Sequence, residues 1–182
     1  MSVLLAATLV ATSSAAPAFG PGSVYALGGV KMAEESVEGT DLDNLYAAGI
    51  GIEGGPNEYV GFVFEFERAT NSERNEFGRV TVSTNEAIAG GRGTLPLGRV
   101  RLFAEAGTVF AALSSRFDPD SGAARSDGDG GVGWFGGAGA SLSVHRNINI
   151  GITVRASRCR TADGIEIGGN HAFMTLGSRF GY

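Results

Sequence analysis

Apolar residues alternate with polar or small residues, at a period of two, through most of the chain beyond residue 20. In the segment 148–157, every second residue is Ile, Val or Ala, and the residues between them are Asn, Gly, Thr, Arg and Ser. Successive side chains of a β-strand point to opposite faces, so this pattern predicts a strand with one apolar face. No segment shows a helical apolar stripe of useful length. The alternation therefore restricts the chain to an all-β fold.

The same pattern recurs often enough to predict about eight strands. It appears in the segments 24–32, 46–53, 60–67, 100–107, 134–144 and 174–182, in addition to 148–157. Each segment is ~10 residues long, which is the length that a tilted strand needs to cross a bilayer. The segment 80–92 is less regular, because Glu86, Ile88 and Arg92 fall on one face. This mixture predicts a β-bulge in that strand.

The links between these segments alternate between short and long. Short links are expected at 54–57, 95–98 and 145–147, and longer polar links at 33–44, 70–78, 114–131 and 159–168. Short turns on one side and long loops on the other are typical of outer-membrane barrels, with the long loops outside the cell. An even number of strands returns both termini to the periplasmic side. The predicted fold is an antiparallel transmembrane β-barrel.

The apolar face is expected to contact lipid. In hydrocarbon every backbone amide needs a partner within the protein, and a closed sheet meets this need because it has no edge. Aromatic residues near strand ends are expected to form girdles at the two membrane interfaces. These are Tyr25, Tyr46, Tyr59, Trp134, Phe180 and Tyr182.

The opposite face carries charged residues that would line the lumen. They are Lys31, Glu53, Glu65, Glu67, Arg101, Glu105, Arg155 and Arg179. A barrel of about eight strands is only wide enough for side chains to fill it, so these charges are expected to pair inside. One interpretation is a structural network that plugs the lumen. The other is a narrow, gated pore in which a pair such as Glu105 and Arg155 swings open.

The N-terminal segment has the character of a secretory signal. Residues 3–10 form a short apolar run, and Ala16-Pro17-Ala18 supplies the small residues that a signal peptidase accepts, although no Lys or Arg precedes the run. We predict a signal peptide over residues 1–18 and a barrel domain over residues 19–182. The formal net charge of -5 argues against a nucleic-acid partner.

Candidate catalytic and metal-binding residues are sparse. Asp118, Asp120, Asp127 and Asp129 lie close together, but no glutamate completes a calcium-binding ladder, so a solvated acidic loop is expected. His145 is expected in a turn, and no serine lies two residues from His171 along its strand, which predicts that a Ser–His nucleophile is absent. We expect no enzymatic activity, no metal and no cofactor.

Two segments resemble the small eight-stranded outer-membrane barrels, the OmpA/OmpX-like porin family. RVRLFAEAGTVF, residues 99–110, is similar to a strand of that family, with Phe103 at its aromatic position and Gly107 at a glycine. TLGSRFGY, residues 175–182, resembles the terminal strand. The resemblance implies an outer-membrane location, lipid and lipopolysaccharide as surroundings, and recognition of Phe180 and Tyr182 by the barrel-assembly machinery.

The leading functional expectation is an integral outer-membrane surface protein that supports the envelope or contacts a host or surface ligand through its outer loops. Two alternatives remain. One is a narrow porin-like channel for ions or small solutes. The other is a soluble, lipocalin-like barrel, in which the apolar stripes would point inward to a ligand and the charges outward.

Overall fold

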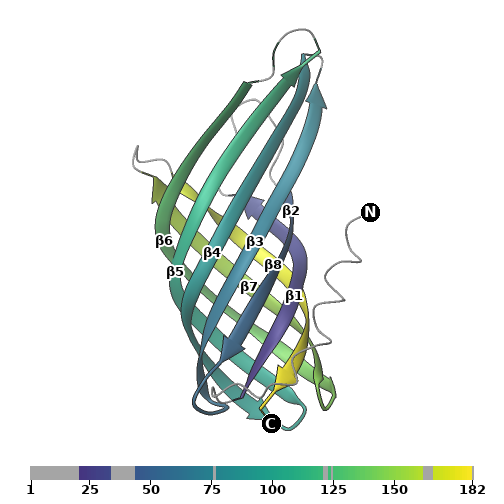
Figure 1. The fold of residues 1–182 in the computed structure, drawn as a ribbon, viewed down its shortest axis with the longest axis vertical. Helices are drawn as coiled ribbons and strands as arrows, with labels where there is room; N and C mark the ends of the chain where they lie inside the picture. Colours follow the sequence, from purple (N-terminus) through teal and green to yellow (C-terminus); the bar gives the residue numbers. More distant parts are fainter. Residues whose placement is uncertain are drawn as a thin grey trace.

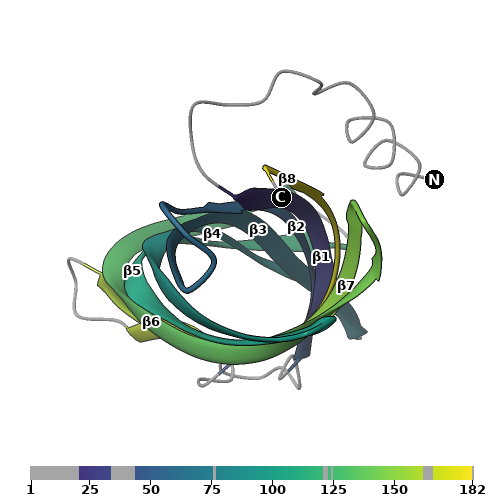
Figure 2. The ribbon, with the colours of Figure 1, turned by 90° about the horizontal axis from the view of Figure 1, so that it is seen from below.

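The computed structural model describes residues 21–33, 44–75, 77–120, 123, 125–161 and 166–181. Eight antiparallel strands close into one barrel, each paired with its neighbours in the chain and β1 paired with β8 (Figures 1 and 2). The strands are β1 (Gly22–Ala33), β2 (Asn44–Gly54), β3 (Val60–Asn75), β4 (Gly78–Leu97), β5 (Val100–Pro119), β6 (Arg125–His145), β7 (Ile148–Thr161) and β8 (Glu166–Phe180). The predicted fold class is confirmed. Within the described residues, no helix is long and apolar enough to cross a membrane.

The strand register places the apolar stripes on the outside of the barrel. Ile152 is 61% exposed and Met174 is 72% exposed, and both point away from the lumen, where Thr153 and Phe173 are buried. The same arrangement holds on β3, where Phe64 is exposed and Val63 is fully buried. The outward face is therefore a continuous apolar surface that lipid, rather than water, can cover.

The predicted bulge in 80–92 is wrong. The registers of β4 with β3 and with β5 run without a shift through Glu86, Ile88 and Arg92, whose side chains are all buried in the lumen. A register shift among the described pairs lies instead between Ser143 and His145, beside the β6–β7 turn. The segment looked irregular because the lumen accepts apolar side chains such as Ile88 as well as charged ones.

Three strands are far longer than a membrane crossing requires, with 20 residues in β4 and β5 and 21 in β6. Most of the loops expected at 70–78 and 114–131 are strand, and Asn75 pairs with Gly78 across a tight turn. Figure 1 shows these strands rising beyond the rest of the barrel. We call the part formed by residues 71–75, 78–84, 114–120 and 125–130 the raised sheet. The other long links, 33–44 and 159–168, fall mainly outside the described residues.

The three short links lie at the opposite end, together with the C-terminus (Figure 1). Asn57 Oδ1 accepts hydrogen bonds from the backbone nitrogens of Tyr59 and Val60, at 2.9 and 3.0 Å, which fixes the β2–β3 turn. Gly98 has a φ of 68° in the β4–β5 turn, a left-handed conformation that favours glycine. The three links predicted to be short therefore lie at one end, but the predicted sorting by length is only partly correct, because the β3–β4 link at the other end is also a tight turn.

Glycines inside the barrel make room for a buried ring. Gly90 and Gly107 are cross-strand partners on β4 and β5, and Phe135 from β6 packs over them. A Cβ on Gly107 would lie 2.9 Å from the Phe135 ring and 2.3 Å from the carbonyl oxygen of Ala89. Part of the high glycine content is thus explained by lumen packing.

The predicted aromatic girdle needs one correction. Tyr46 and Trp134 are exposed on the outer face and Tyr59 is exposed in the β2–β3 turn, but Tyr25 is only 5% exposed and lies inside the barrel. Its hydroxyl donates a hydrogen bond of 2.5 Å to Glu65 Oε1. The prediction for Tyr25 relied on its closeness to a strand end, whereas the alternation with outward-facing Val24 turns it inward. Phe180 is partly exposed, and Tyr182 lies outside the described residues.

Candidate functional site

The structure brings the predicted lumen charges together inside the barrel. Lys31, Glu53, Glu65, Glu67, Glu105 and Arg155 are buried, and Arg101 and Arg179 are partly buried. Seven of these residues take part in ion pairs with one another or with Arg92, Glu86 and His171. Arg179 lies near the short turns and donates a hydrogen bond of 2.6 Å to Ser143. Side chains from seven of the eight strands thus form one internal network.

Arg92 holds the part of this network nearest the short turns. Its guanidinium contacts Glu53 and donates from Nε to Glu105 Oε2 at 2.9 Å. Arg101 reaches the other oxygen of Glu53 at 3.2 Å, and the Arg92 guanidinium lies 4.2 Å from the centre of the Phe103 ring. Arg92 was absent from the predicted lumen set, because the segment 80–92 has an irregular alternation.

Arg155 joins three carboxylates at the middle of the barrel. Its Nη2 lies 2.7 Å from Glu65 Oε2 and 2.7 Å from Glu105 Oε1, and its Nη1 lies 3.6 Å from Glu67 Oε2. The Arg155 side chain is 1% exposed. Because Glu105 also binds Arg92, the Glu105–Arg155 pair is one link in a larger network and not an isolated gate.

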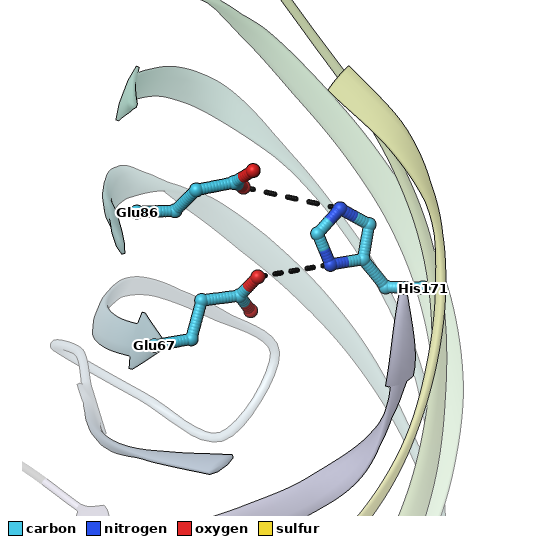
Figure 3. Close-up of side chains that lie close together, drawn as sticks. All are labelled: Glu67, Glu86 and His171. Carbon is cyan, nitrogen blue, oxygen red and sulfur yellow. Dashed lines mark ion pairs between the residues drawn. The ribbon is translucent and has the colours of Figure 1, made fainter. Parts of the chain in front are cut away.

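A third group of residues lies nearer the outer end, around His171. The imidazole lies between the carboxylates of Glu67 and Glu86 (Figure 3), with Nδ1 2.9 Å from Glu67 Oε1 and Nε2 3.8 Å from Glu86 Oε2. The ammonium group of Lys31 binds the other oxygen of Glu86. Glu86 and His171 were absent from the predicted lumen set, although inward alternation along β4 and β8 was a signal that pointed to both.

Ser157 Oγ lies 3.0 Å from His171 Nε2. The prediction that no serine meets a histidine is therefore wrong. It considered spacing along one strand only, whereas Ser157 and His171 lie on the neighbouring strands β7 and β8, where Arg155 is the register partner of His171. Ser157, His171 and Glu67 have the order of an acyl-transfer triad. The serine is only 1% exposed, so a substrate cannot reach its hydroxyl in this conformation.

The rest of the lumen is filled by side chains. Buried apolar residues extend the filling toward the end of the barrel that carries the raised sheet. They include Leu45, Ala69, Val82 and Val109, together with Cys159. Two cavities near Arg92 each have a volume of about 20 Å³, which is room for about one water molecule. An apolar hollow of about 240 Å³ lies on the lipid-facing side and is lined by Leu142, Ile152 and Met174, among others.

The family is identified by a family model described as the outer membrane protein beta-barrel domain, which matches residues 2–182. The chain belongs to this family. Its place is the outer membrane, in agreement with the apolar outer face and the closed strand order.

Solved structures of the outer-membrane barrel type are similar to this chain. The attachment invasion locus protein Ail of Yersinia pestis, in complex with the heparin analogue sucrose octasulfate, has a TM-score of 0.64 at 15% identity, covering 88% of this chain and 99% of that one. OprG of Pseudomonas aeruginosa has a TM-score of 0.59 at 10% identity, covering 90% and 97%. The N-terminal barrel of OprF from the same organism has a TM-score of 0.54 at 14% identity, covering 89% and 98%. No curated protein matches.

These findings exclude the soluble, lipocalin-like alternative. That arrangement needs the isoleucine stripe of β7 inside the barrel, but Ile148, Ile150 and Ile152 are exposed on the outside while the lumen holds the charges. A water-soluble protein would not present such a stripe on every side of its surface.

Proposed function

We propose that this protein is a non-conducting surface component of the outer membrane, which acts through its outer end and not through its lumen. The observation that carries this proposal is the filled interior, in which Arg92, Arg155 and Lys31 connect five carboxylates from four strands. A solute would have to separate several buried ion pairs at once, and removing one partner from such a pair costs several kcal/mol. The narrow channel is therefore the weaker candidate.

The raised sheet is the surface best placed for contact with molecules outside the cell. Its described charged residues are four arginines and five acids: Arg74, Arg79, Arg116 and Arg125, with Glu73, Asp118, Asp120, Asp127 and Asp129. Pairs such as Arg74 with Asp120, at 2.9 Å, are solvent-exposed. The sheet is thus mixed in charge. We expect it to contact a protein surface of mixed charge and not a sulfated polysaccharide, although the Ail structure holds a heparin analogue.

The contact role is tested by shortening the β5–β6 hairpin. Arg116 and Ser126 are register partners, so residues 117–125 can be replaced by Asn-Gly without changing the register. Cells that display the full chain should adhere to surfaces coated with host matrix protein, and cells with the shortened chain should lose this adhesion. Neither should bind heparin above an empty-vector control. Equal adhesion by the two chains would contradict a role for the raised sheet.

Arginines on the outer face are suited to lipopolysaccharide. Arg158 and Arg160 point outward on β7, beyond the apolar stripe, and Trp134 is the register partner of Arg158. A basic residue near an anionic membrane surface contributes about 1 kcal/mol to the attraction. We propose that these two arginines contact the phosphate groups of lipopolysaccharide.

Changing Arg158 and Arg160 together to glutamine should reduce the lipopolysaccharide that co-purifies with the barrel, by several-fold if each contributes about 1 kcal/mol. Arg99 and Arg146 offer a matched control, because both are exposed near the short turns at the opposite end. The measurement is the lipopolysaccharide-to-protein ratio after purification in mild detergent. An equal decrease in the two double variants would show that position does not matter and would contradict the proposal.

Two other expectations remain proposals. The burial of Ser157 supports a protein without acyl-transfer activity, despite the order of Ser157, His171 and Glu67. Labelling with a fluorophosphonate probe tests this, since modification of Ser157 in the folded barrel would contradict it.

Phe180 and Tyr182 remain the proposed signal for the barrel-assembly machinery. Deletion of Phe180–Tyr182 should prevent assembly of the barrel in the membrane. Normal assembly of the shortened chain would contradict the proposal that these residues are the signal.

A further inference from the structure

The group around His171 is built from three strands and is almost completely buried. Glu67 comes from β3, Glu86 from β4 and His171 from β8, and each residue is at most 2% exposed. One ligand atom from each residue can be chosen so that all three lie within 4.8 Å of one another. Figure 3 shows both carboxylates directed at the imidazole ring.

The two nitrogens of the His171 ring differ in their hydrogen bonds. His171 Nε2 has a partner in Ser157 Oγ, at 3.0 Å. On the other side, neither His171 Nδ1 nor either oxygen of Glu67 makes a hydrogen bond of good geometry, although Nδ1 and Oε1 lie 2.9 Å apart. Buried polar atoms without hydrogen bonds are uncommon in proteins and call for a partner.

Few positively charged groups lie close to the carboxylates of Glu67 and Glu86. Lys31 from β1 binds Glu86, whereas Glu67 has Arg155 from β7 at 3.6 Å, and Arg155 is engaged more closely by Glu65 and Glu105. The other polar groups at this level, Thr84 and Ser157, are neutral. A buried carboxylate with incomplete compensation favours the binding of a cation.

We propose that His171 Nδ1, Glu67 and Glu86 bind a divalent transition-metal ion of the zinc type inside the barrel. Imidazole nitrogen and carboxylate oxygen are both ligand atoms that zinc accepts in proteins. The Nε2–H group then donates to Ser157, which fixes the ring in the way that second-shell hydrogen bonds orient metal-binding histidines. Lys31 remains paired with Oε1 of Glu86. The ion joins β3, β4 and β8 across the lumen and supplies the charge that Glu67 lacks.

The sequence offers a sharp test because it contains only two histidines. His145 is exposed beside the β6–β7 turn, so the full chain with His145→Gln leaves His171 as the sole imidazole. This protein is refolded in detergent with Zn²⁺ present, so that the ion need not enter a closed barrel. It is then dialysed, and bound zinc is counted by mass spectrometry. X-ray absorption at the zinc edge reports whether an imidazole is bound.

We expect one zinc ion per chain, bound to one imidazole and otherwise to oxygen. Adding His171→Gln or Glu67→Gln to the same background should weaken zinc binding by more than about 100-fold, because even second-shell changes cost roughly 10–100-fold. A gel-mobility shift on boiling checks that each variant is folded. If the variants do not fold, the absorption spectrum of the His145→Gln protein decides alone. Absence of zinc from that protein, zinc without an imidazole, or zinc retained after folding with His171→Gln would overturn the proposal.

Discussion

Replacing Arg155 with methionine should lower the free energy of unfolding by about 3–5 kcal/mol, because the change leaves buried carboxylates without a partner. Arg155 is the only cation within 3 Å of Glu65 among the described ion pairs, and it also pairs with Glu105 and Glu67. Methionine keeps much of the side-chain volume, so the loss reports charge rather than an empty cavity.

The measurement is reversible urea unfolding in lipid vesicles, followed by the fluorescence of Trp134, the only tryptophan. Arg74→Met is the matched control. Arg74 forms an ion pair of similar length with Asp120, but its side chain is 65% exposed, so its removal should cost only about 0–1 kcal/mol. A loss at Arg155 no larger than that at Arg74 would contradict the buried network.

Replacing Ile152 with arginine should destabilise the barrel by about 2–4 kcal/mol, the cost of a basic residue on the lipid face near the middle of the bilayer. Ile152 points outward from β7 and lies well inside its apolar stripe. The equivalent change at Ile148, the first residue of β7 and next to the short turn, should cost only about 0–1 kcal/mol. The assay is the same urea unfolding.

The comparison of these two sites depends on depth alone, since both are outward-facing isoleucines on one strand. Folding in detergent micelles should reduce the difference, because a micelle adapts to a charged side chain more readily than a bilayer does. Equal costs at the two positions in vesicles would show that the stripe is not oriented across a membrane as the structure indicates.

The strand pattern and the two faces of the barrel could be predicted from the sequence because they depend on local alternation. The stripe from Ile148 to Val154 faces outward as predicted, and Thr153 and Arg155 face inward. The prediction for Tyr25 was wrong because its nearness to a strand end was given more weight than the alternation of side chains along the strand. The inward position of Glu86 and Arg92 was obscured by Ile88, since the expectation of a uniformly polar lumen has no place for a buried isoleucine.

The contacts across the lumen could not be predicted in the same way. Ser157 meets His171, and Glu67 meets His171, only after the register of β7 with β8 and the closure of the barrel are fixed. Neither follows from the spacing of residues along one strand. The length of β4, β5 and β6 was also missed, because strands outside lipid need no apolar stripe and polar residues such as Arg116 and Asp118 are equally typical of loops.

The most direct test of a filled, non-conducting barrel is electrical recording from planar bilayers that contain the purified protein. The protein should first be shown to change its gel mobility on boiling, which establishes that it is a folded barrel. We predict that the folded protein adds no discrete current steps above those of the bare bilayer across the usual range of voltage. Reproducible steps that disappear when the protein is boiled before insertion would contradict this account and would identify the lumen as a conducting path.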